Sequence, residues 1–100
     1  MPSIPEYPDA LAQVGEVLEF YSARAAVLPR CLELEDKTRL AARAALHARI
    51  NLPVLSAELG RLAAESLPAR AATDAGRAMA RWAAREYYGA LGLDAGEGTS

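Results

Sequence analysis

The sequence predicts an all-α protein, a small bundle of three to four mostly antiparallel helices around a single core. Alanine, the residue with the highest helix propensity, occupies 23 of the 100 positions. Apolar residues recur at spacings of three and four, which is the period of a helix. No stretch alternates apolar and polar residues in the way that marks a half-buried strand, and the sequence contains no internal repeat.

The first helix is predicted over residues 9–28. Pro8 and Asp9 suit a helix start, because proline lacks an N–H that the first turn would leave unbonded, and aspartate favours the positive end of the helix dipole. Pro29 ends the helix, because it would remove an internal hydrogen bond. The helix carries the clearest packing stripe in the sequence, with a heptad-like spacing. That stripe, which Val17 and Phe20 widen, consists of Leu11, Val14, Leu18, Tyr21, Ala25 and Leu28.

Residues 31–35 are predicted to form a linker, in which Leu32 and Leu34 could cover one end of the bundle. Asp36 is a suitable N-cap for a second helix over residues 37–51. The apolar stripe of this helix is poor, because alanine occupies all of its sides. The sequence therefore predicts the helix better than it predicts which face is buried.

Asn51 and Pro53 leave two alternatives for the middle of the chain. Residues 37–66 could form one long helix with a kink at the proline, or a new helix could run over residues 53–66. We favour the break, because an asparagine and a proline this close together are typical of a helix boundary. Gly60 weakens the third helix or allows another helix to approach it closely.

A last helix is predicted to begin either at Pro68 or after Thr73 and Asp74, which are suitable capping residues. It continues to Leu91. Gly92 suits the position just beyond a helix end, where a left-handed backbone conformation is common.

The expected organisation is one domain over residues 9–92, preceded by an extended arm over residues 1–8 and followed by a flexible tail over residues 93–100. A chain of this size builds only a modest core, and alanine contributes little apolar area to it. We therefore expect the protein to gain further burial by self-association.

Composition excludes several classes of protein. The net charge of −2 disfavours bulk attraction to nucleic acids or to anionic membranes. Cys31 is the only cysteine, so an intrachain disulfide is impossible. The first residues lack the basic and apolar regions of a signal peptide, and no apolar run approaches the roughly 20 residues that span a bilayer. We expect a cytoplasmic protein with no membrane segment.

The sequence offers few groups for catalysis. His47, the only histidine, is a candidate general base, and Cys31 is a candidate nucleophile. Neither has a partner that the spacing identifies, so a surface histidine and a small loop residue are the favoured interpretations. The ligand spacings of metal sites are missing, and no metal or cofactor is expected.

Three arginines, Arg77, Arg81 and Arg85, recur at every fourth residue and therefore share one helix face. Like charges at this spacing repel each other, so the row suggests acidic neighbours. A solvated face is the favoured interpretation, binding of an anion or an acidic partner is the next, and nucleic-acid binding is the least favoured. Carboxylates that could serve within the bundle or across a dimer are Glu16, Glu19, Glu58 and Glu65.

Aromatic residues cluster near the end of the last helix. Tyrosine and tryptophan are enriched at interfaces, because they combine a large apolar area with a polar tip. Tyr87 and Tyr88 point about 100° apart on a helix, so only one of them faces the core. The candidate interface residues are Leu11, Val14, Leu18, Tyr21, Trp82, Tyr87 and Tyr88.

The favoured function is that of a small non-enzymatic interaction or accessory protein, which self-associates or docks on a larger protein. A small enzyme or ligand-binding bundle is the alternative, with a small-molecule pocket between the first and last helices. That pocket would be lined by Tyr21, His47, Arg81, Trp82, Arg85 and Tyr87. A DNA-binding regulator is the least favoured interpretation. It would need a helix-turn-helix turn near Gly60, and the residues that follow lack a basic recognition face.

Overall fold

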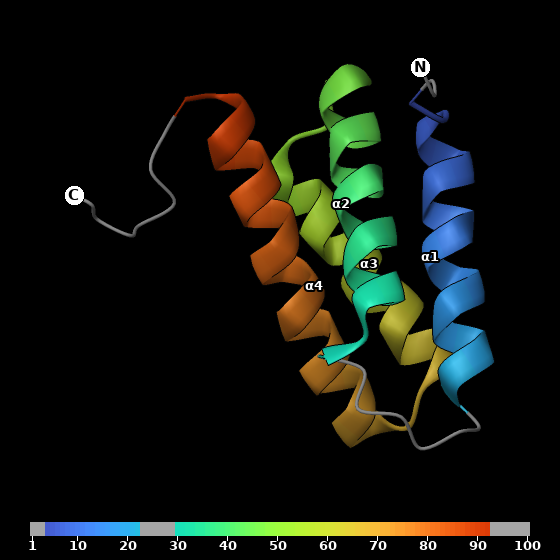
Figure 1. The fold of residues 1–100 in the computed structure, drawn as a ribbon. Helices are drawn as coiled ribbons and strands as arrows, with labels where there is room; N and C mark the ends of the chain where they lie inside the picture. The colour runs from blue at the N-terminus through green and yellow to red at the C-terminus, as the bar shows by residue number, and fades with distance from the viewer. Residues whose placement is uncertain (1–3, 23–29, 93–100) are drawn as a thin grey trace.

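The computed structural model describes residues 4–22 and 30–92, and this part of the chain contains four helices and no strand (Figure 1). These are α1 (Tyr7–Ser22), α2 (Leu32–His47), α3 (Leu52–Ser66) and α4 (Ala69–Ala90). Figure 1 shows that successive helices run in opposite directions. The predicted all-α bundle is therefore confirmed.

The four helices form two antiparallel pairs, α1 with α2 and α3 with α4. The pairs pack on each other through α1 against α3 and α2 against α4. In Figure 1, α1 and α4 lie at opposite sides of the bundle, with α2 and α3 between them. The core therefore lies at the centre, and the outer faces of α1 and α4 point in different directions.

α1 begins at Tyr7, two residues before the predicted start, and Pro8 is accommodated within its first turn. Its core face is close to the predicted one. Val14 and Leu18 are fully buried, and Leu11 and Tyr21 are half-buried against the core. The last part of the predicted stripe, with Ala25 and Leu28, lies outside the described residues, as does the helix end predicted at Pro29.

The predicted linker over residues 31–35 is wrong, because α2 already begins at Leu32. The backbone N–H of Glu35 donates to the Cys31 carbonyl oxygen at 3.1 Å, which closes the first turn. Two glutamates in this turn interact favourably with the helix dipole. Asp36 therefore lies inside the helix and does not cap it. The helical start also places Leu34 in the core, where it is fully buried.

α2 ends at His47, four residues before the predicted end, in a Schellman motif. The N–H of Ile50 donates to the Ala45 carbonyl oxygen at 2.8 Å, and the N–H of Arg49 donates to the Leu46 carbonyl oxygen at 3.1 Å. Arg49 has a φ of 62°, in the left-handed region that usually requires glycine. The motif turns the chain within three residues and directs it into α3.

Asn51 and Pro53 mark a true break, so the predicted separate third helix is confirmed and the long kinked helix is not formed. The Asn51 side chain accepts a hydrogen bond from the Val54 N–H at 3.0 Å, which caps the first turn of α3. Gly60 lies inside this continuous helix. The turn that a helix-turn-helix motif would need near Gly60 is therefore not formed.

α4 begins at Ala69, directly after Pro68, so the earlier of its two predicted starts is correct. Thr73 is already inside the helix, where its hydroxyl donates to the Ala69 carbonyl oxygen at 3.0 Å. At the other end Gly92 has a φ of 76°, as predicted for the residue that follows the helix end.

The core consists of a few large side chains surrounded by alanine. The largest fully buried residues are Val14, Leu18, Leu34, Thr38, Leu55, Leu59 and Met79. α3 and α4 approach each other closely at two glycines, since a Cβ placed on Gly76 would lie 3.9 Å from the Cα of Gly60. Thr38 is the exception in this apolar interior, because its hydroxyl oxygen is buried without a hydrogen-bond partner among the described residues.

Replacing Arg49 with glycine is expected to stabilise the protein by about 0.5–1 kcal/mol, because glycine adopts a positive φ without steric cost. Urea denaturation measures the free energy of unfolding. Ala48→Gly is the matched control, since Ala48 has a φ of −86° and gains nothing from glycine. Equal effects of the two substitutions would contradict the assignment of the motif.

Thr38→Val is expected to stabilise the protein by about 1 kcal/mol, because it removes a buried hydroxyl without a partner and keeps the shape of the side chain. Thr38→Ser keeps the hydroxyl and removes a methyl group, so it should destabilise the protein. If the valine variant has the lower melting temperature of the two, the hydroxyl has a partner in solution.

Candidate functional site

The solvent-exposed face of α4 carries the predicted row of arginines. Arg77, Arg81 and Arg85 are all exposed, and they lie opposite the side of the helix that buries Met79 and Trp82. Tyr88 follows Arg85 three residues later, so it continues the same face by one turn. We call Arg77, Arg81 and Arg85 the arginine row.

Two of the four carboxylates that were expected to neutralise this row, Glu58 and Glu65, are engaged elsewhere. Arg61 binds Glu58 at 2.7 Å and Glu65 at 2.8 Å on its own helix. These two ion pairs raise the pKa of the Arg61 guanidinium. The expected pairing of Glu58 and Glu65 with the arginine row is therefore not formed.

Glu86, the one carboxylate in the second half of α4, faces α2. Its carboxylate lies 2.9 Å from the Nε of Arg43 and 3.8 Å from the Nε of Arg39, which also contacts Glu35 at 3.4 Å. Glu86 thus links α4 to α2 on the side away from the arginine row. Within residues 4–22 and 30–92, the arginine row has no carboxylate within 4.0 Å.

A shallow apolar hollow lies where the end of α4 meets the start of α3. Its volume is about 610 Å³. Leu91, which is 62% exposed, and Tyr88, which is 38% exposed, form one wall. We call it the C-terminal hollow; its lining residues are Leu46, Asn51, Leu52, Pro53, Ser56, Tyr87, Tyr88 and Leu91.

The two tyrosines of this hollow are among the interface residues predicted from the sequence, whereas its other lining residues are not. Leu91 follows Tyr88 by three residues and directly precedes the Gly92 helix end, and this placement could have marked it as an exposed apolar residue. Leu52 and Pro53 carried no comparable signal. They reach the hollow only because α3 packs antiparallel to α4.

Tyr87 and Tyr88 divide between core and surface, as their 100° separation predicts. Tyr87 is buried, and its hydroxyl donates to the Ile50 carbonyl oxygen at 2.7 Å, which ties the α2–α3 connection to α4. Tyr88 is exposed. Trp82 is buried in the core, so it anchors α4 within the chain.

Most of the predicted stripe on α1 is used inside the chain. Val14 and Leu18 have no exposed surface, and Leu11 is half-buried against the same core. Tyr21 lies at the end of α1, where its hydroxyl donates to Glu33 at 3.2 Å. That hydrogen bond, together with burial, raises the pKa of Tyr21.

The opposite face of α1 is acidic. Asp9, Glu16 and Glu19 are exposed, and the spacings of seven and three residues place them on one side of the helix. Their carboxylates have no ion-pair partner within the part of the chain that the structure describes. We call these three residues the acidic row.

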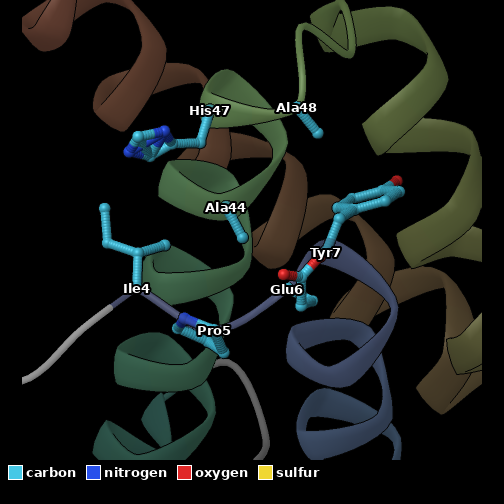
Figure 2. Close-up of a pocket in the computed structure, with 7 residues that line it drawn as sticks. All are labelled: Ile4, Pro5, Glu6, Tyr7, Ala44, His47 and Ala48. Atoms are coloured by element: carbon cyan, nitrogen blue, oxygen red, sulfur yellow. The ribbon is translucent and has the colours of Figure 1, made fainter.

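His47 lines a small pocket of about 330 Å³ between α2 and the residues that lead into α1 (Figure 2). Its imidazole is exposed and points toward Ile4, whereas the ring of Tyr7 turns away from it (Figure 2). Ion pairs or hydrogen bonds to the imidazole are absent among the described residues. The geometry gives this histidine no group that would orient it for acid–base chemistry.

Cys31 and His47 do not form a pair. Cys31 precedes the first residue of α2 and His47 is the last, so about 24 Å of helix separates them at 1.5 Å per residue. Cys31 is half-buried beside Tyr21, where it contributes to the raised pKa of the Tyr21 hydroxyl.

The predicted pocket between the first and last helices is not formed. α1 and α4 lie at opposite sides of the bundle. The Tyr21 hydroxyl binds Glu33 in the first turn of α2, whereas the Tyr87 hydroxyl binds Ile50 in the α2–α3 connection. None of the described hollows is lined by two of the six predicted residues, which are Tyr21, His47, Arg81, Trp82, Arg85 and Tyr87. Tyr87 and Trp82 belong to the core, and Arg81 and Arg85 point to solvent.

Comparison with known protein families, with curated proteins and with solved structures found no match for this chain. Among the described residues, no helix is both long and apolar enough to cross a membrane. The same residues contain no cluster of three histidine, cysteine or carboxylate side chains that could hold a metal ion.

Tyr7, at the start of α1, and Tyr87, near the end of α4, make stability depend on alkaline pH. Burial raises the pKa of Tyr7 and of Tyr87 above their ordinary value of 10.0. The Tyr7 hydroxyl is buried without a hydrogen-bond partner among the described residues, whereas the Tyr87 hydroxyl has one. The folded protein therefore favours the protonated phenols. The contribution of the two phenols to stability is fully present below pH 10, and it is lost as the pH rises through their raised pKa values.

Tyr87→Phe is expected to cost about 1 kcal/mol near neutral pH, because it removes the hydrogen bond to Ile50. Tyr7→Phe should be neutral or stabilising by up to about 1 kcal/mol, because no bond is lost. Urea denaturation near pH 8 and at about pH 11 should show that each variant loses less stability on alkalinisation than the parent protein. A parent protein whose stability is unchanged at high pH would refute the burial of both phenols.

Proposed function

We propose that this protein is a non-enzymatic interaction protein that binds another polypeptide through the outer face of α4. The binding surface consists of the arginine row and the C-terminal hollow. The partner is a second copy of the chain or a larger protein.

The arginine row is the observation that carries the proposal. Three like charges at a spacing of four residues repel one another by a few tenths of a kcal/mol per pair. Glu58, Glu65 and Glu86 bind other arginines. Asp74, the remaining carboxylate of α3 and α4, is exposed on the same face three residues before Arg77 and forms no ion pair with the row within the described residues. Arg81 and Arg85 therefore have no carboxylate within 4.0 Å to offset their repulsion. An acidic partner would relieve it.

The C-terminal hollow supports the proposal independently. It continues the arginine row at the end of α4 and exposes Tyr88 and Leu91 beside Leu52 and Pro53. An apolar centre containing an aromatic residue and a rim of arginine is the composition that characterises protein interfaces. A small-molecule site would require more enclosure than this open surface provides.

The alternatives receive less support. The enzyme or ligand-binding interpretation depended on a pocket between α1 and α4, where core side chains lie instead. The DNA-binding interpretation depended on a turn that is part of a continuous helix. For the compartment we propose the cytoplasm, on the composition of the sequence alone.

Leu91→Asp is expected to abolish complex formation, because it places a charge in the apolar centre of the surface. Native mass spectrometry of protein purified from its own host measures the complex. Val54→Asp is the matched control, since Val54 is also exposed, at 47%, and does not line the hollow. We expect the Leu91 variant to bind at least about tenfold more weakly than the control. Equal binding by both variants, or a parent protein without any complex, would contradict the proposal.

A further inference from the structure

We infer that the partner of the arginine row is the acidic row on α1 of a second copy, so that copies associate head to tail. This inference rests on the proposed function and specifies its partner. Each copy carries one basic and one acidic helix face of similar length. The electrostatic complement of α4 is therefore present in the same chain.

The two rows are matched in length and composition. Arg77 and Arg85 are eight residues apart, or about 12 Å along α4, and Asp9 and Glu19 are ten residues apart, or about 15 Å along α1. Each row contains three charges of one sign. Ala12, between the acidic residues, is small enough to allow a second helix to approach.

The rows also agree in direction when the two helices are placed parallel. Eleven residues separate Asp9 from Phe20, and eleven separate Arg77 from Tyr88. With Asp9 level with Arg77, the exposed ring of Phe20 comes level with Tyr88 and the C-terminal hollow. In this alignment Glu16 comes within one residue of the level of Arg85, so the charges at both ends of the arginine row and the apolar surface are matched together.

A single chain cannot form this contact by itself. α1 and α4 lie at opposite sides of the bundle, with α2 and α3 between them. Both rows are exposed and have no opposite charge within 4.0 Å among the described residues. Ion pairs between the two rows can therefore form only between copies.

The predicted assembly is heterologous. The two contacting faces are different and point in different directions, so each copy has one face occupied and one open after the first contact. Such a contact continues until a ring closes or a chain forms. Because the ion pairs lie at the rim, added salt should weaken the association.

A charge exchange tests the inference with the full-length protein. Glu16→Arg/Glu19→Arg makes the acidic row basic, and Arg81→Glu/Arg85→Glu makes the arginine row acidic. Each variant alone carries two faces of like charge, so its dissociation constant for self-association should rise at least about tenfold. An equimolar mixture carries complementary faces at every contact and should associate again. Sedimentation velocity in about 50 mM and about 500 mM salt measures all three samples.

Arg30→Glu/Arg49→Glu is the control for net charge, because it changes the charge by the same amount outside α4. It should associate like the parent protein, and circular dichroism should show that every variant is folded. Failure of the mixture to associate, association that stops at a dimer, or a parent protein that is monomeric at low salt would each overturn the inference. If the parent is monomeric but the Leu91→Asp variant loses a complex with another protein, the proposed function stands and only the identity of its partner fails.

Discussion

Alanine makes up ten of the twenty buried apolar residues in the described part of the chain, and the close helix packing that it allows governs the rest of the structure. α2 contributes four buried alanines to the core, and α4 contributes another four. Small side chains allow helix backbones to approach closely, as α3 and α4 do at Gly60 and Gly76. The interior then holds few large residues and leaves little room for an internal binding site. Groups that could act on another molecule are found on the outer faces.

Because the core is thin, the connections between the helices contribute to fixing their positions. The α2–α3 connection adopts a left-handed conformation at Arg49 and then a capped helix start at Asn51. The Tyr87 hydroxyl binds this connection through the Ile50 carbonyl group, so the end of α4 is held beside the start of α3. The same arrangement creates the C-terminal hollow. The strongest candidate surface is thus a consequence of how two helix ends are joined.

The distribution of charge separates structural ion pairs from surface charge. Glu86 links α4 to two arginines on α2, and Arg61 forms ion pairs with both glutamates of α3. These pairs are partly exposed, and each contributes at most about 1 kcal/mol to stability. The exposed charges outside these pairs include the arginine row on α4 and the acidic row on α1, which lie on opposite sides of the molecule. A chain with a small net charge therefore carries a strong separation of charge.

The sequence by itself determined the helices, the break at Asn51 and Pro53, the core face of α1 and the shared face of the three arginines. Each of these follows from local spacing, helix propensity or capping chemistry. It could not determine the start of α2, because Cys31 offers no side-chain cap and the helix there is favoured by burial of Leu34. Nor could it determine which helices are neighbours, because alanine makes several faces equally suitable for packing. Only the tertiary structure decided that Glu86 binds Arg39 and Arg43 on α2, that α1 and α4 lie at opposite sides of the bundle, and that Leu52 and Leu91 line one hollow.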